Sequence, residues 1–115
     1  MASNRDLPIQ LDTITDGVVM RPSGDIDLSK APSFRTQIAE VFQEKHARVI
    51  IDLSEVPYMD SSGVATLVEG MQIASRSGSK FILSGLQERV RSIFEIARLD
   101  TVFTITRDLD SAERA

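Results

Sequence analysis

The sequence predicts an α/β fold, in which a small mixed sheet is opened by an N-terminal hairpin and flanked by helices. Two strand-like segments come first with no helix between them, and strand-like and helix-like segments then alternate along the chain. The 115 residues are enough for one domain with its own core, and they contain no internal repeat, low-complexity segment or linker. We therefore expect residues 1–115 to form a single domain.

An antiparallel hairpin is expected at the start of the chain. Apolar and polar residues alternate over Ile9–Thr13, as on a half-buried strand. The dipeptide Asp16-Gly17 is typical of a hairpin turn. A second strand over Val18–Met20 should follow and end before Pro22.

The first helix should begin near Leu28–Pro32, after a short extended segment at Asp25–Asp27. A serine such as Ser29 can accept backbone N–H bonds at a helix start, and proline is tolerated in the first turn. The apolar residues recur at helical spacing and are Phe34, Ile38, Val41 and Phe42.

The remaining elements continue the alternation. They are expected to be a buried strand at Arg48–Leu53, a helix from about Val64 to Arg76 capped by Gly78, a strand at Lys80–Leu83, a helix over Val90–Ala97, an edge strand at Val102–Ile105 and a short terminal helix or frayed tail. The connections are long enough for right-handed crossovers, so these strands should pair in parallel beneath a helical layer on at least one face.

Composition argues against several classes of partner and location. The net charge of -4 gives no electrostatic reason to expect nucleic acid or direct binding to an anionic membrane. There is no cysteine, which excludes disulfides and thiolate metal sites and fits a reducing compartment. The N-terminal MASNRDLPIQ has no apolar run typical of a signal peptide, and no apolar stretch is long enough to span a bilayer. We therefore expect a cytoplasmic protein.

The sequence does not predict an enzyme or a cofactor site. A nucleophilic serine needs a base, and the only histidine, His46, lies in a polar stretch that we interpret as an exposed loop. Neither G-x-S-x-G nor a glycine-rich phosphate loop is present. Ser77-Gly78-Ser79-Lys80 leads into a strand, whereas the lysine of a phosphate loop opens a helix.

Four aspartates could in principle supply oxygen ligands to a metal ion, and they are Asp25, Asp27, Asp52 and Asp60. Such acids also build the phospho-acceptor site of a two-component receiver, where the acceptor ends a central strand as Asp52 does. A receiver begins with strand–helix alternation, however, and this chain begins with a predicted hairpin. We therefore expect no metal site and interpret the acids as turn and helix-start residues.

The segment Asp60-Ser61-Ser62 allows two interpretations. Aspartate and serine are preferred N-cap residues, and helical spacing starts at Val64, so the segment is suited to begin a helix. The preceding loop, residues 53–59, carries apolar side chains after a buried strand. Helix N-termini at the carboxyl edge of a sheet also favour phosphate.

The stretch VIIDLSEVPYMDSSGVATLV resembles the signature of STAS domains, specifically the bacterial anti-sigma factor antagonists. SGDIDLSKAP resembles an earlier segment of that family, and GSKFILSGLQERVRSIFEIARLDTVFTI resembles its C-terminal half. The resemblance runs from about Leu11 to Ile105. Relatives often have Leu-Gly where this chain has Val64-Ala65, a difference that bears on partner specificity more than on the fold.

The resemblance implies a switch in which the unphosphorylated protein binds a serine-kinase anti-sigma factor and so releases the sigma factor. The kinase would phosphorylate Ser61, and a PP2C-type phosphatase would reverse the step. Asp27, Asp60, Ser62 and Gly63 would join Ser61 on the partner-binding surface, with no catalytic residue in the chain. The alternative is a STAS regulatory subunit of a membrane transporter or of a larger signalling assembly.

Overall fold

A five-stranded sheet organises residues 6–115, which are the residues that this computed structural model describes. The elements in chain order are β1 (Ile9–Ile14), β2 (Gly17–Pro22), α1 (Ala31–Phe42), β3 (Arg48–Asp52), α2 (Ser61–Ser77), β4 (Lys80–Ser84), α3 (Glu88–Ile96), a 3₁₀ helix (Leu99–Thr101), β5 (Thr104–Thr106) and α4 (Leu109–Arg114). Residues 1–5 lie outside the described residues. They are the first half of the N-terminal segment MASNRDLPIQ, in which we expect no signal peptide.

The sheet is mixed and begins with the hairpin, as predicted. Its strands follow one another in chain order, from β1 at one edge to β5 at the other. β1 and β2 are antiparallel, and every later neighbour pair is parallel. The carboxyl ends of β2, β3 and β4 consequently lie along the same edge of the sheet, where the loops that follow them can meet.

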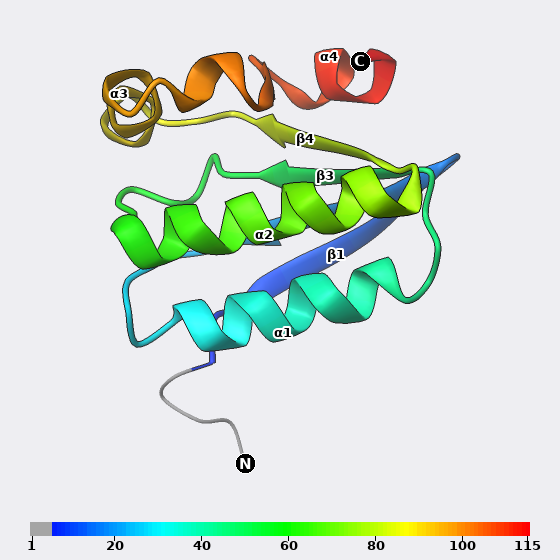
Figure 1. Cartoon of the computed structure of the whole chain (residues 1–115), viewed down its shortest axis with the longest axis horizontal. Coiled ribbons are helices and arrows are strands. Elements are labelled where there is room, and N and C mark those ends of the chain that lie inside the picture. The colour runs from blue at the N-terminus through cyan, green and yellow to red at the C-terminus, as the bar shows by residue number, and fades with distance from the viewer. Residues whose placement is uncertain (1–5) are drawn as a thin grey trace.

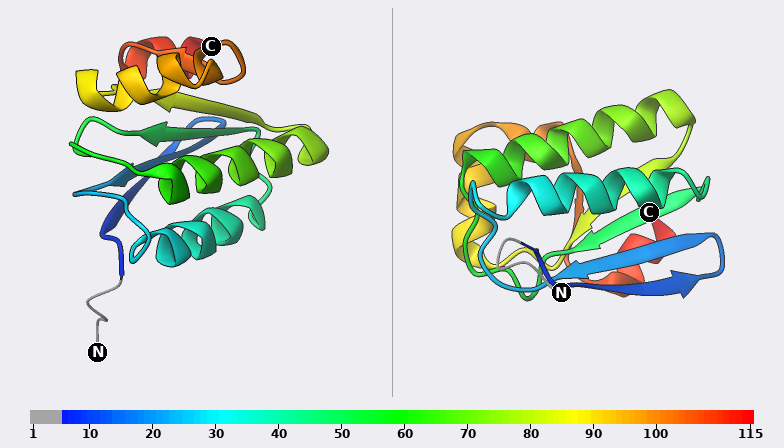
Figure 2. Two further views of the ribbon diagram at one scale, coloured as in Figure 1. Left: turned by 60° about the vertical axis from the view of Figure 1, so that its left-hand side comes forward. Right: turned by 90° about the horizontal axis from the view of Figure 1, so that it is seen from below.

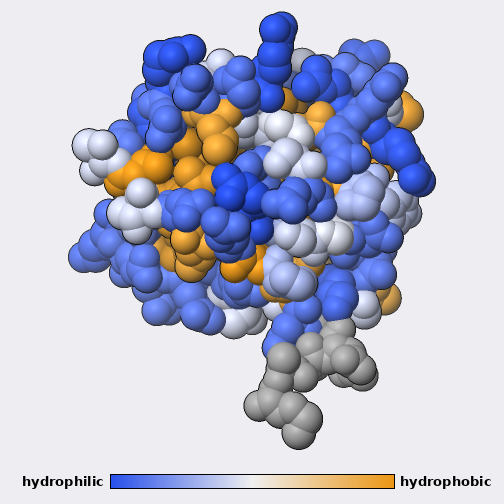
Figure 3. All heavy atoms as spheres, turned by 180° about the vertical axis from the view of Figure 1, so that it is seen from behind, coloured by the Kyte–Doolittle hydropathy of each residue, from blue (hydrophilic) through white to orange (hydrophobic). Residues whose placement is uncertain are grey.

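Helices cover both faces of the sheet. α1 and α2 lie side by side over one face, and α4 packs on the other face against β3, β4 and β5 (Figures 1 and 2). α3 lies beside the loop that leads into α2 (Figure 1). Seen from behind, the surface is mostly hydrophilic and is interrupted by apolar patches (Figure 3).

β3 is buried on both faces because alternate residues point into two separate apolar clusters. Val49 and Ile51 join the larger cluster beneath α1 and α2, whereas Ile50 packs with residues that include Ala112 of α4. All three β3 residues are fully buried. This burial explains the continuous apolar run in the sequence.

The hairpin differs from the prediction in the role of Gly17. The turn consists of Thr15 and Asp16, and Gly17 is already the first residue of β2. A side chain at Gly17 would collide with the backbone carbonyl of Arg48 on β3, so glycine is needed here for close strand approach. β1 is also more exposed than a half-buried strand, with Leu11 53% exposed.

The start of α1 is the second difference. Lys30 precedes the helix and makes no side-chain cap, while the carboxylate of Asp27 accepts the amide hydrogens of Ser29 and Lys30. Ser29 does not cap the helix, because its hydroxyl donates to Asp27. Pro32 does lie in the first turn, as predicted.

The C-terminal half follows the predicted order with small shifts in its boundaries. Gly78 ends α2 in the left-handed conformation, with a φ of 73°, as a glycine cap should. The last strand begins at Thr104, separated by two residues from a 3₁₀ helix that ends at Thr101. The predicted tail is helix α4, whose final carbonyls accept hydrogen bonds from the guanidinium of Arg48.

Candidate functional site

Two loops run side by side where β2 and β3 end. Residues 23–30 follow β2, and residues 53–60 follow β3. The amide of Gly24 donates to the carbonyl of Glu55 at 3.0 Å, and the amide of Ile26 donates to Tyr58 at 3.0 Å. Ile26 also forms a parallel bridge with Met59, and both side chains are fully buried. Apolar anchors and backbone bonds together hold the paired loops on the sheet edge.

Asp60 joins the two loops to the start of α2. One carboxylate oxygen accepts the amide hydrogens of Ser62 at 2.9 Å and Gly63 at 3.4 Å, which makes Asp60 the N-cap. The other oxygen accepts the amide hydrogen of Leu28 from the neighbouring loop at 3.1 Å. The predicted cap is therefore present, and it also binds a second segment of the chain.

The hydroxyls near the start of α2 differ in accessibility. Ser61 is the first residue of the helix and is exposed, and its hydroxyl has no hydrogen-bond partner within residues 6–115. Ser62 is half-buried and donates to Asp60. Thr66 is 1% exposed and donates to the carbonyl of Ser62. Ser61 thus presents the one unengaged hydroxyl among these three side chains.

Gly63 allows the first turn of α2 to approach both loops. A Cβ atom at this position would lie 2.5 Å from Met59 Cγ and 3.0 Å from Ile26 Cγ2. Both distances are shorter than normal carbon–carbon contacts. The glycine therefore sets how closely the helix start, and Ser61 with it, sits against the paired loops.

The site carries concentrated negative charge. A hydrogen bond from the Ser29 hydroxyl lowers the pKa of Asp27, although the nearby charge of Asp60 opposes this shift. A hydrogen bond from the Ser62 hydroxyl likewise lowers the pKa of Asp60. Both carboxylates are consequently ionised at neutral pH.

Two exposed side chains at the site, Leu28 and Tyr58, were not among the predicted site residues. Leu28 is 75% exposed and lines a shallow hollow with Asp27, Pro32 and Asp60. Tyr58 is 38% exposed, and the guanidinium of Arg89 on α3 lies 5.6 Å from its ring centre. Leu28 could have been found from the sequence. It is a large apolar residue between Asp27 and the helix start, and it does not belong to the apolar residues that recur at helical spacing.

The other candidate groups lie elsewhere. His46 is bonded to Glu44 just before β3, at the opposite end of that strand from the site. The carboxylate of Asp52 forms an ion pair with the guanidinium of Arg21, whose Nε lies 2.8 Å from Asp52 Oδ2. Within residues 6–115 no three acidic or histidine groups are placed to hold a metal ion.

No helix of residues 6–115 is both long enough and apolar enough to cross a membrane.

Comparisons with known proteins agree with this architecture. The model of the STAS domain family matches residues 8–112. An anti-sigma-B factor antagonist of Listeria monocytogenes is 36% identical over 92 residues, covering 79% of this chain and 80% of the relative. The crystal structure of an anti-sigma factor antagonist from Mycobacterium paratuberculosis superposes with a TM-score of 0.87 at 22% identity, covering 99% of this chain and 97% of that one.

The fold is also similar to that of the Bacillus cell fate determinant SpoIIAA in its phosphorylated form. That comparison gives a TM-score of 0.71 at 24% identity and covers 93% of this chain and 98% of the other. The family match extends over nearly all the described residues and includes both loops of the site. The chain belongs to the STAS domain family.

Proposed function

We propose that this protein is an anti-sigma factor antagonist that is switched by phosphorylation of Ser61. The unphosphorylated protein binds a kinase-type anti-sigma factor, which then releases its sigma factor. The anti-sigma factor transfers the γ-phosphate of ATP to the Ser61 oxygen, the hydroxyl proton is lost, and ADP leaves. A PP2C-type phosphatase hydrolyses the phosphoserine, and the protein itself contributes no catalytic group.

The observation that carries this proposal is the accessible hydroxyl of Ser61 beside two hydroxyls that are already engaged. A kinase must bring ATP to the oxygen that it phosphorylates, and Ser61 meets this requirement at the first position of α2. Ser62 and Thr66 would each have to give up a hydrogen bond. The similar antagonist of Listeria monocytogenes, which is named for an anti-sigma factor, supports the choice of partner.

The charges around Ser61 give a physical reason for the switch. A phosphoserine adds a charge of about -1.5 to -2 at neutral pH. At a helix N-terminus this charge interacts favourably with the helix dipole by roughly 0.3–1 kcal/mol, so the fold should persist. In an interface it would be desolvated beside the carboxylates of Asp27 and Asp60, at a cost of several kcal/mol. Partner binding should therefore be lost without unfolding.

The proposal is tested by affinity purification from the native cell, with phosphopeptide mapping of the same sample. We expect the wild-type protein to recover an anti-sigma factor and to carry its phosphate on Ser61. Ser61→Ala should lack the phosphate and retain the partner, whereas Ser62→Ala should still be phosphorylated on Ser61. Phosphate found chiefly on Ser62 or Thr66 would refute the site, and recovery of a transporter in place of an anti-sigma factor would refute the partner.

A further inference from the structure

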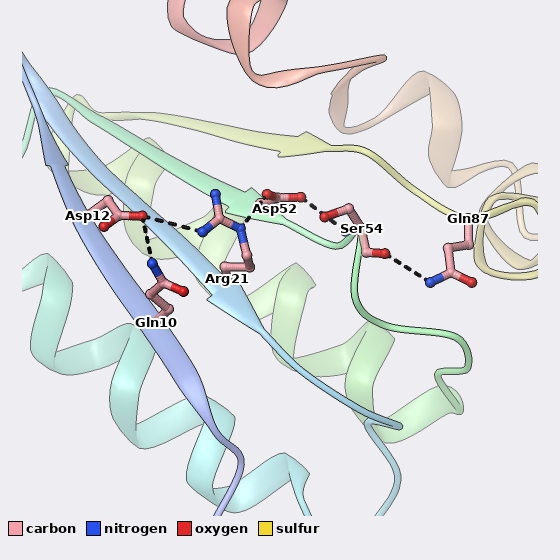
Figure 4. Close-up of polar contacts among 6 residues, drawn as sticks. All are labelled: Gln10, Asp12, Arg21, Asp52, Ser54 and Gln87. Atoms are coloured by element: carbon pink, nitrogen blue, oxygen red, sulfur yellow. Dashed lines mark hydrogen bonds and ion pairs between the residues drawn. The ribbon is translucent and has the colours of Figure 1, made fainter.

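A line of polar contacts crosses the sheet from β1 to the start of α3. Arg21 on β2 lies at its centre, with Nε 2.8 Å from Asp52 Oδ2 and Nη1 3.4 Å from Asp12 Oδ2 (Figure 4). The other oxygen of Asp52 accepts the amide hydrogen of Ser54 at 3.0 Å. The carbonyl of Ser54 in turn accepts a hydrogen bond from the side chain of Gln87 at 2.9 Å.

The pair of Arg21 and Asp52 sits where β2 and β3 separate into the two loops of the site. The parallel backbone pairing of these strands ends at Met20 and Ile51, so Arg21 and Asp52 are the next residues along each strand. Beyond them the chain continues directly into residues 23–30 and 53–60. The side-chain pair thus continues the connection between the strands for one residue after their backbone pairing stops.

Asp52 also lies close to the third segment at this edge of the sheet. Gly85 follows β4 and has a φ of 70°, and a Cβ atom there would lie 3.1 Å from Asp52 Oδ1. The Asp52 carboxylate therefore bonds the strand before the first loop and the start of the second loop, and it leaves no room for a side chain in the turn that leads to α3. Its side chain is 7% exposed, so its position is fixed by these contacts and not by solvent.

Fold stability alone does not account for a charged pair at this position. Removing two charges from water is unfavourable, and apolar residues of similar volume often stabilise a protein equally well or better. A carboxylate that accepts directed bonds from two segments does, however, define their relative geometry. The same geometry places Asp27 on one loop and Asp60 at the end of the other, directly before Ser61.

We infer that Arg21 and Asp52 are positioning residues that hold the two loops of the partner-binding site in register. They act through the loops and do not touch the partner. The effect on partner affinity rests on the function proposed above, whereas the effect on loop order in the free protein does not.

The experiment compares Asp52→Asn with Asp12→Asn in the full-length protein. Each change removes one negative charge next to the same guanidinium, but the side chain of Asp12 is 49% exposed and lies on the edge strand. Amide hydrogen exchange is measured at Gly24, Ile26 and Asp60, which donate the hydrogen bonds between the loops, and along β4 as a reference. Affinity for the purified anti-sigma factor is measured on the same samples.

We expect the three loop amides to exchange about tenfold faster in Asp52→Asn than in Asp12→Asn, as the loss of a charge-assisted bond implies, while β4 stays protected. Partner affinity should fall by a similar factor. If the loop amides exchange equally in both variants, or if all amides accelerate by one common factor, the inference is wrong. If the loops loosen and affinity is unchanged, the pair does not position the partner-binding site.

Arg21→Lys provides a second variant that keeps the charge and loses the guanidinium geometry. It should give an intermediate rise in loop exchange, and wild-type exchange in this variant would overturn the role assigned to the guanidinium. If Asp52→Asn fails to fold, Arg21→Lys alone tests whether the pair of Arg21 and Asp52 orders the loops. If the wild-type protein binds no anti-sigma factor, the proposed function fails, and the exchange measurements still decide whether the pair orders the loops.

Discussion

Replacing Asp60 by Ala should destabilise the protein by more than an ordinary surface substitution. The change removes the acceptor for the amides of Ser62 and Gly63 at the start of α2. It also removes the acceptor for the amide of Leu28 on the neighbouring loop. One substitution therefore disconnects the helix start and weakens the contact between the two loops.

The structure allows the magnitude to be worked out from these two losses. Truncating an N-cap aspartate to alanine costs about 0.5–2 kcal/mol. A lost amide–carboxylate hydrogen bond costs about 1 kcal/mol more. We expect a total of about 1.5–3 kcal/mol, which corresponds to a fall of roughly 10 °C in Tm for a domain of this size.

Urea unfolding followed by far-ultraviolet circular dichroism measures the effect, with two matched variants of Asp60. Asp60→Asn keeps one acceptor oxygen, which can still cap Ser62 and Gly63, but its amide nitrogen cannot accept the amide hydrogen of Leu28, so it should cost about 1 kcal/mol, the value of a single hydrogen bond. Asp60→Ser also keeps a cap and is too short to reach Leu28, so it should cost about as much as Asp60→Asn and less than Asp60→Ala. If Asp60→Ala unfolds within about 0.5 kcal/mol of wild type, the range of a surface change, then Asp60 does not connect the helix and the loop.

Three further outcomes follow from the same contacts. Gly63→Ala should cost about 1–3 kcal/mol by overpacking against Met59, and chemical denaturation showing no loss would mean that the loops can move aside. Leu28→Ala should leave Tm unchanged because the side chain is exposed, yet weaken the anti-sigma factor complex in a titration; unchanged affinity would place Leu28 outside the interface. The pKa values of Asp52 and Asp60 are lowered from the ordinary 3.8 in the folded state. The free energy of unfolding should therefore be at its full value above pH 3.8 and fall as the pH drops through the lowered pKa values of the folded protein. A free energy of urea unfolding that does not change with pH below about 5 would contradict this.

The helix start at Asp60 could be predicted from the sequence because capping is a local interaction. The cap and the amides that it accepts are within three residues of one another, so residue type and spacing are sufficient. The bond from Asp60 to Leu28 could not be predicted in this way. It joins residues 32 positions apart and exists only because β2 and β3 are parallel neighbours.

Two details of the prediction were wrong for different reasons. Gly17 resembles a turn residue in the sequence, but its glycine is required by the carbonyl of Arg48 on another strand, and a contact between such distant segments has no local signal. Ser29 resembles a helix cap, but the carboxylate of Asp27 accepts the amides of Ser29 and Lys30 instead. This second contact is local, and aspartate and serine are both preferred at a helix start, so residue type alone did not distinguish Asp27 from Ser29.

The same distinction applies to the candidate site. Asp60, Ser61, Ser62 and Gly63 are consecutive and could be found as one motif, whereas Asp27 joined them only through the family resemblance. The contact between Arg21 and Asp52 has no local pattern, since an arginine in one strand and an aspartate ending another are common. Only the structure, in which Arg21 Nε lies 2.8 Å from Asp52 Oδ2, identifies them as a pair.

The most direct test of the switch is a binding titration of the anti-sigma factor with protein phosphorylated only on Ser61, beside a melting curve of the same sample. We expect affinity to fall by about 10²-fold or more, which corresponds to about 2.7 kcal/mol, while Tm stays at or slightly above that of the unphosphorylated protein. Affinity equal to that of the unphosphorylated protein would contradict the assignment of Ser61 as the switch. Loss of binding accompanied by unfolding would contradict the physical explanation, in which the phosphate is compatible with the helix start and incompatible with the interface.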